Sequence, residues 1–179
     1  MTAKEFYESW ADKNGFWQPQ QAYIIALGNN DILYFITRLA VLRTSILIHR
    51  RIIQTHFFGN LGRILSRLKS LEKNARIFLV SMQRRGEEEC DAVIRQIACE
   101  MKKVCRLFSF TYLIDMTNDG PIYDETMRKT FALGFHPNPV GYYCYALMVG
   151  NYIDYLIRRF PKDFFEVPFI GTSLKNKDV

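Results

Sequence analysis

Residues 22–31 read Ala-Tyr-Ile-Ile-Ala-Leu-Gly-Asn-Asn-Asp, an uninterrupted apolar run that ends in small polar residues. Six apolar residues are too few for a helix, and a strand that is apolar on both faces is typical of a parallel sheet covered by helices. Gly, Asn and Asp favour turns. This stretch therefore predicts a buried parallel strand over residues 22–27, followed by a loop over residues 28–31.

The rest of the chain alternates between similar apolar runs and helical patterns. We predict two more strands, over residues 76–82 and 107–114, and four helices, over residues 2–14, 56–72, 87–105 and 139–160. Strands that alternate with helices imply right-handed crossovers and a parallel sheet with helices on both faces. The expected fold class is α/β, a three-layer α/β/α arrangement with a doubly wound parallel sheet, and 179 residues fit a single domain.

The composition limits the classes of partner and cofactor. Of the six excess positive charges, four come from the arginines of residues 32–54, which contain no acid, so we expect no nucleic-acid function for the domain as a whole. The four cysteines show no metal-ligand spacing, and free thiols are typical of a reducing compartment. The first residues lack an apolar signal core. We therefore expect a cytoplasmic protein whose cysteines do not bind a metal.

A second polar motif lies near the end of the chain. His136-Pro137-Asn138-Pro139 leads through Gly141-Tyr142 into the last predicted helix. Ligands of doubly wound sheets bind beyond the carboxyl ends of the strands. Asn30 follows the first strand and His136 follows the last one, so both side chains are expected at this edge of the sheet.

An apolar strand that ends in Gly-x-Asn-Asp, followed much later by a loop histidine at a helix start, resembles the SGNH (GDSL-like) hydrolase family. Residues 1–31 and 56–172 are similar to a branch of this family common in anaerobic gut bacteria. The resemblance implies a flavodoxin-like SGNH-hydrolase fold in a bacterial protein. It also implies hydrolysis of small-molecule acyl esters or acetylated carbohydrates through a serine acyl-enzyme, without a metal or cofactor.

The resemblance also suggests roles for individual residues. In the family the asparagine donates a hydrogen bond to the oxyanion and the histidine is the general base, which corresponds here to Asn30 and His136. The other candidates for the oxyanion and ligand site are Gly28, Asp31 and Asn138.

Two departures from the family pattern concern the catalytic machinery. The chain contains no Gly-Asp-Ser, so the resemblance implies that the nucleophile and the first two strands lie upstream of Met1. Ser9 is predicted to lie within a helix, without the sharp turn that exposes a nucleophile. Much of the family carries an aspartate three residues before the histidine, where this chain has Leu133. The group that orients His136 is then a backbone carbonyl or another carboxylate such as Asp115.

These departures leave three functional hypotheses. The first is an ester hydrolase by descent whose chain is inactive alone, and the second is a non-catalytic binding remnant that keeps the ligand cleft. The third is a basic protein that binds membranes or nucleic acid through residues 32–54. If two strands are missing, the strand over residues 22–27 becomes an exposed apolar edge, which invites formation of a homo-oligomer.

Residues 32–54 are atypical for the family and have two interpretations. The apolar run is interrupted by Arg38 and Arg43, so it is no transmembrane span, and it reads either as a genuine basic amphipathic helix or as a product of a shifted reading frame. Codons chosen for residues 40–53, read from their third base, encode the acidic, polar loop that relatives tend to carry. Sequencing the locus separates the two.

Overall fold

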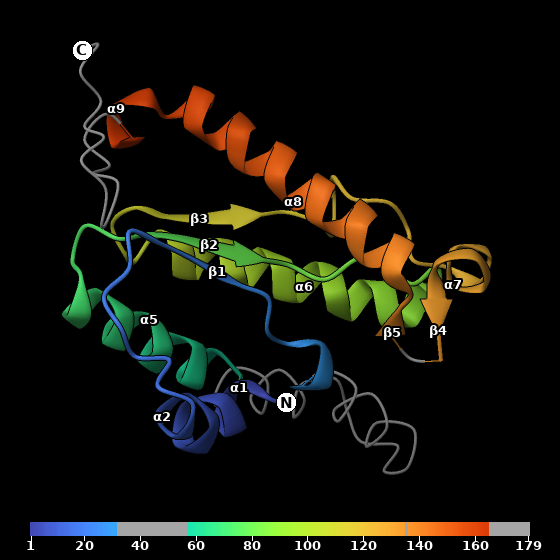
Figure 1. The fold of residues 1–179 in the computed structure, drawn as a ribbon. Helices are drawn as coiled ribbons and strands as arrows, with labels where there is room; N and C mark the ends of the chain where they lie inside the picture. The colour runs from blue at the N-terminus through green and yellow to red at the C-terminus, as the bar shows by residue number, and fades with distance from the viewer. Residues whose placement is uncertain (32–56, 135, 165–179) are drawn as a thin grey trace.

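The computed structural model describes residues 1–31, 57–134 and 136–164, which form an α/β fold around a three-stranded parallel sheet (Figure 1). The sheet order is β1–β2–β3. Residues 32–54 lie outside the described residues. The structure therefore tests neither the amphipathic helix nor the shifted reading frame, and it does not test binding of membranes or nucleic acid through this segment. The strands span Ala22–Ile25 (β1), Arg76–Val80 (β2) and Thr111–Ile114 (β3).

The parallel pairing confirms the class of sheet that the apolar runs predict. Ile24 lies beside Phe78, which in turn lies beside Tyr112. All five residues of the central strand β2 are buried, as expected for a strand with neighbours on both edges and helices over both faces. The third strand begins at Thr111 rather than at residue 107, because the chain still turns after the preceding helix and Phe110 has a positive φ of 52°.

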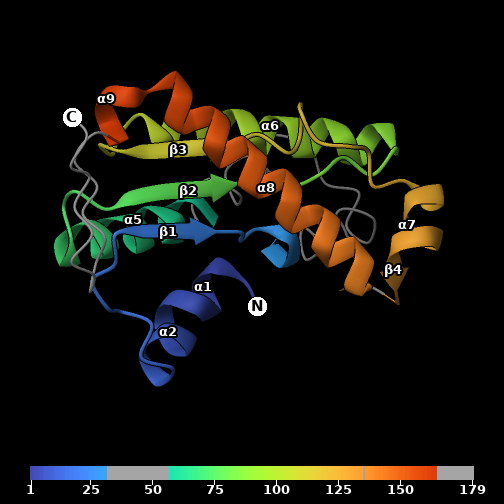
Figure 2. The same ribbon diagram turned by 45° about the horizontal axis from the view of Figure 1, so that its top comes forward.

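Helices cover both faces of the sheet. Helices α5 (Gly59–Leu71) and α6 (Glu88–Cys105) lie on one face, and α8 (Pro139–Arg159) crosses the other face diagonally (Figures 1 and 2). Two apolar cores result. One packs Leu65 and Leu68 against Ile77, and the other packs Val149 against Phe78. The helices predicted over residues 56–72, 87–105 and 139–160 are thus confirmed, with ends that agree to within three residues.

The N-terminal helix is less regular than its pattern predicts. It consists of α1 (Ala3–Glu5), a π-helical segment η1 (Phe6–Trp10) and α2 (Ala11–Lys13). The capping box is confirmed, because the Glu5 amide donates to Thr2 Oγ1 over 3.2 Å and the Thr2 amide donates to Glu5 Oε2 over 2.8 Å.

Three short elements were not predicted. Helix α7 spans Glu125–Phe131, and an antiparallel hairpin of β4 (Ala132–Leu133) and β5 (His136–Pro137) connects it to α8. A final short helix, α9 (Pro161–Phe164), follows α8. The hairpin lies near the ends of the strands, on the side toward which the strands point (Figure 1).

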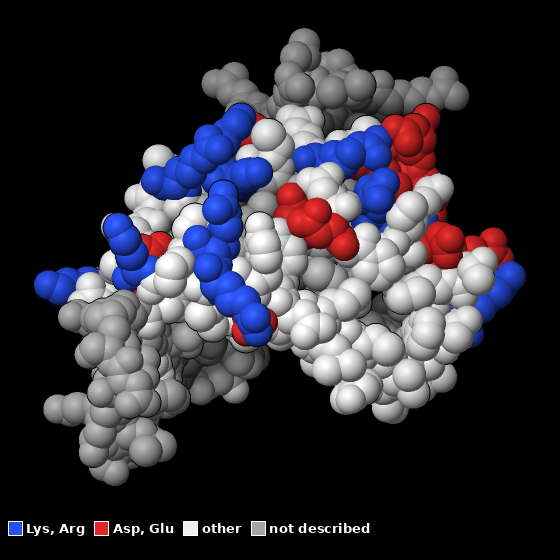
Figure 3. Space-filling view, turned by 90° about the horizontal axis from the view of Figure 1, so that it is seen from above, with Lys and Arg blue, Asp and Glu red and all other residues white. Residues whose placement is uncertain are grey.

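Strand β1 leaves one edge of the sheet open among the described residues. Its buried side chains, Tyr23 and Ile25, face the core with α5, whereas Ile24 is 56% exposed because α8 packs on β2 and β3 instead. The surface over the first half of α8 is also uncharged (Figure 3), and Tyr143 and Leu147 are exposed there. An exposed apolar edge strand is a site for pairing with a second chain.

We expect the protein to self-associate through β1, and Ile24→Lys to weaken this association because a lysine on an edge strand opposes strand pairing. Sedimentation velocity over a range of concentrations measures the effect. Ile122→Lys is the matched control, since Ile122 is 39% exposed in the segment before α7 and is not part of the sheet. A wild-type protein that stays monomeric, or equal association of all three proteins, would contradict the expectation.

Candidate functional site

A pocket of about 610 Å³ lies at the carboxyl ends of β1 and β2. One wall comes from the segments after these strands and includes Asn29, Asn30, Ser81, Met82, Gln83 and Arg85. Asn29 and Asn30 are helical, so the predicted loop over residues 28–31 is wrong from residue 29 onward. The opposite wall comes from the C-terminal part of the described chain and includes Tyr123, His136, Pro137, Tyr142 and Tyr145. The volume lies within the range of roughly 300–1,000 Å³ that is usual for small-molecule sites.

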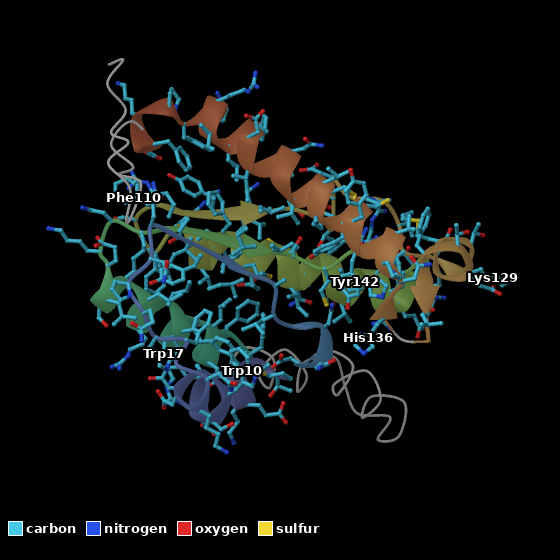
Figure 4. The ribbon with its side chains drawn as sticks, viewed as in Figure 1. Trp10, Trp17, Phe110, Lys129, His136 and Tyr142 are labelled. Atoms are coloured by element: carbon cyan, nitrogen blue, oxygen red, sulfur yellow. The ribbon has the colours of Figure 1, made fainter. Side chains whose placement is uncertain are left out.

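The two side chains that the sequence singles out line this same pocket. Asn30 lies beyond the end of β1, and its Nδ2 makes one long hydrogen bond to the Met1 carbonyl, at 3.4 Å. His136 is exposed on the pocket rim, and in the described part of the chain its imidazole has no hydrogen bond or ion pair. Figure 4 shows His136 and Tyr142 at this end of the sheet, away from the aromatic side chains of the N-terminal helices.

The position of His136 follows from the local hairpin. Gly134, with a φ of 65°, takes part in the turn between β4 and β5, a conformation that side chains with a Cβ rarely adopt. Leu133 pairs directly with His136 across the hairpin and is exposed. A side chain at position 133 therefore lies beside the imidazole. In this chain that position carries no charge to orient the ring.

Asn138 acts on the backbone rather than lining the pocket. It is the N-cap of α8, where its Oδ1 accepts a hydrogen bond from the Gly141 amide over 2.8 Å, while its Nδ2 donates to the Thr130 carbonyl over 3.0 Å. Its own amide donates to the Phe131 carbonyl over 2.8 Å. These bonds fix the hairpin that carries His136 to the start of α8.

Gly28 and Asp31 also have structural contacts, and neither lines the pocket. Gly28 has a φ of 121°, and a Cβ there would lie 3.1 Å from the Phe57 ring, so the turn after β1 requires glycine. Asp31 is buried, and its Oδ2 accepts a hydrogen bond from the Ala3 amide over 3.0 Å. Burial raises the pKa of the Asp31 carboxyl, although the Ala3 amide opposes this effect.

The serine in the pocket wall is held by a buried network. Ser81 is 2% exposed, and its Oγ accepts a hydrogen bond from the Thr117 amide over 3.1 Å. The same Oγ lies 3.0 Å from Thr117 Oγ1 and donates to Asp115 Oδ1 over 3.4 Å. Ser9, the other serine considered above, donates to the Glu5 carbonyl and does not line the pocket.

Asp115, one of the two alternatives for orienting the histidine, is engaged elsewhere. Its carboxylate accepts hydrogen bonds from the Asn118 amide at 3.1 Å and from Asn118 Nδ2 at 2.8 Å, besides the one from Ser81. None of its hydrogen bonds within the described residues involves His136.

The lining residues that the sequence did not single out as site residues include Gln83, Arg85, Tyr123, Tyr142 and Tyr145. The rule that locates Asn30 could have found Gln83 and Arg85, since both follow a buried parallel strand. The tyrosines carry no such signal, because α7, the hairpin and α8 bring them to the pocket only in the folded chain. Burial raises the pKa of the Tyr145 hydroxyl, and the Tyr123 hydroxyl is buried without a hydrogen-bond partner.

Within residues 1–31, 57–134 and 136–164, His, Cys, Asp and Glu side chains do not gather in any group of three that could hold a metal ion. Over the same residues, no helix combines the length and the apolarity needed to cross a membrane. Comparisons of the chain with protein-family models, with curated proteins and with solved structures find no match.

Proposed function

We propose that this chain carries the ligand-binding and general-base side of an SGNH-type ester hydrolase site. The observation that carries the proposal is that Asn30 and His136, from opposite ends of the described chain, line one pocket at the carboxyl ends of parallel strands. The ligand would be an acyl ester or an acetylated carbohydrate. The flavodoxin-like arrangement of that family is part of the proposal, and the three parallel strands with helices on both faces support it.

Each of the two residues has a chemical task in this proposal. The imidazole of His136 would accept the proton of an attacking hydroxyl, and Asn30 Nδ2 would donate to the oxyanion that forms on the ester carbonyl. Asn30 Nδ2 has spare capacity for this task, because its hydrogen bond to the Met1 carbonyl is long, at 3.4 Å, and uses only one of its two N–H groups. The exposed imidazole of His136 is likewise open to a ligand from the pocket.

The pocket lacks a suitable nucleophile among its described lining residues. A serine nucleophile needs a base within hydrogen-bond reach, whereas the hydroxyl of Ser81 is buried and bonded to Thr117 and Asp115. We therefore propose that this chain binds an ester ligand without turning it over. This proposal combines the first two hypotheses, namely an ester hydrolase whose chain is inactive alone and a non-catalytic remnant that keeps the ligand cleft.

We expect the 179-residue chain to hydrolyse para-nitrophenyl acetate no faster than buffer does. We also expect an acetylated sugar to shift the amide resonances of pocket residues in heteronuclear NMR spectra, and binding to weaken in Asn30→Ala and His136→Ala. Asn151→Ala is the matched control, because Asn151 is exposed on α8 and does not line the pocket. Hydrolysis that His136→Ala abolishes would overturn the expected inactivity, and the absence of any binding would overturn the proposed site.

A further inference from the structure

The described lining of the pocket contains a positive charge and no acidic residue. Arg85 is part of the lining, whereas neither Asp nor Glu is. Arg85 is partly buried, and within the described residues its guanidinium forms no ion pair and no hydrogen bond. Partly buried arginines usually satisfy their donors with an anion or a carbonyl, as the neighbouring Arg84 does with the Thr117 carbonyl over 3.0 Å.

Asp91, the buried acid nearest to Arg85 in the sequence, forms no ion pair with the Arg85 guanidinium. Asp91 is 4% exposed, and its carboxylate accepts backbone hydrogen bonds from the amides of Arg85, over 2.6 Å, and Gly86, over 3.2 Å. Those bonds fix the loop after β2, so that the Arg85 backbone is held while its side chain lines the pocket.

A second donor in the pocket wall lacks a partner. The hydroxyl of Tyr123 is buried and has no hydrogen bond in the described part of the chain. The backbone of Tyr123 is held in place, because its amide donates to the Arg84 carbonyl over 2.6 Å. A buried hydroxyl without a partner is unfavourable and rare in folded proteins, so a ligand that accepts a hydrogen bond from it would remove that penalty.

We propose that the ligand of this pocket is a sugar-sized molecule with an oxyanion group, a carboxylate or a phosphate, which Arg85 binds and to which Tyr123 donates a hydrogen bond. The planar guanidinium matches either oxyanion with two parallel hydrogen bonds. Tyr142 and Tyr145 supply aromatic surface for a sugar ring in the same pocket. The inference rests on the proposed function and narrows its ligands from acyl esters in general to esters of acidic sugars.

The test compares three probes on the full chain by NMR titration: glucose, glucuronate and glucose 6-phosphate. We expect at least one charged probe to bind about tenfold or more tightly than glucose, since hydrogen bonds to charged groups are the strong ones. The tighter of the two charged probes identifies the oxyanion. In Arg85→Gln the preference over glucose should vanish, while Arg95→Gln should keep it, because Arg95 lies on α6 in an exposed pair with Glu88.

Tyr123→Phe separates ligand binding from folding. The Tyr123 hydroxyl has no hydrogen bond to lose within the described residues, so the midpoint of thermal unfolding should not fall, while the charged probe should bind several-fold more weakly. Tyr143→Phe is the control, because Tyr143 is 64% exposed on α8 and does not line the pocket. An effect on binding that accompanies a loss of stability would indicate a structural role for Tyr123 instead.

Equal affinity for glucose and both charged probes, or a preference that survives in Arg85→Gln, would overturn the inference. The proposed function would still stand if a neutral acetylated sugar bound with the expected sensitivity to Asn30→Ala. Failure of the neutral acetylated sugar and of all three probes to bind would instead overturn the proposed function. The two proposals therefore fail in different ways.

Discussion

Gly141→Ala is expected to destabilise the protein by about 2 kcal/mol, although alanine is the better helix former. A Cβ at position 141 would meet the Phe131 carbonyl oxygen at under 3.0 Å, a separation that real Cβ atoms essentially never show. That oxygen accepts a hydrogen bond from the Asn138 amide. The added methyl group therefore cannot be accommodated by rotation of a flexible side chain, and the backbone of the hairpin must move away from α8.

The displacement matters for the site because the same hairpin carries His136. We expect Gly141→Ala to weaken binding of any ligand that contacts the histidine. Urea denaturation measures the loss of stability, and NMR titration with the acetylated sugar measures the loss of binding. Gly150→Ala in the same helix is the matched control, since a Cβ there meets nothing within 4 Å. That control should be more stable than wild type by about 0.5–1 kcal/mol. If Gly141→Ala behaved like Gly150→Ala, the close packing of the hairpin on α8 would be wrong.

The parts of the fold that sequence predicts well are those whose signal is local and repeated. The run Arg76–Val80 is apolar after its first residue and lies between two other strands, so a single rule places it at the centre of the sheet. Likewise, a helical stripe that includes Leu61, Leu65 and Leu68 marks the buried face of α5. In both elements the pattern of apolar residues is sufficient to predict the secondary structure and the buried face.

The sequence-based predictions of secondary structure are wrong where contacts between distant segments determine the local conformation. Residues 107–110 look like the start of a strand, yet Leu107 is 77% exposed and Phe110 turns with a positive φ. The Arg76 guanidinium lies 4.5 Å from the centroid of the Phe110 ring, a contact between segments far apart in the sequence. The hairpin strands have two residues each, too few for any alternating pattern to be recognised.

The residues predicted for the candidate site also fall into two groups. The sequence identifies Asn30 and His136 because each follows or precedes a regular element, and both line the pocket. Gly28, Asp31 and Asn138 come from the same motifs but shape the backbone around it. Short polar motifs contain both kinds of residue, and only their contacts in the folded chain distinguish them.

Thr117→Val is expected to cost about 1–3 kcal/mol of stability, because it removes a buried hydroxyl while keeping the shape of the side chain. Thr117 is fully buried, and its Oγ1 donates to the Met82 carbonyl over 2.6 Å and lies 3.0 Å from Ser81 Oγ. Valine leaves both of these oxygens without that partner. Because Ser81 and Met82 form part of the pocket wall, the network joins the end of β2 to the loop after β3 and gives the pocket a fixed base.

Thermal and urea denaturation of Thr117→Val, Ser81→Ala and the double variant measure the coupling between the two hydroxyls. We expect the double variant to lose less stability than the sum of the single variants, by about 0.5 kcal/mol or more, since both changes break one network. Thr130→Val is the control. Thr130 is exposed on α7 and its hydroxyl bonds within the helix, so its loss should cost no more than about 0.5 kcal/mol. Additive effects, or equal losses at positions 117 and 130, would show that the hydroxyl of Ser81 is not held in this network. Ser81, which lines the same pocket as His136, would then become a candidate for the nucleophile.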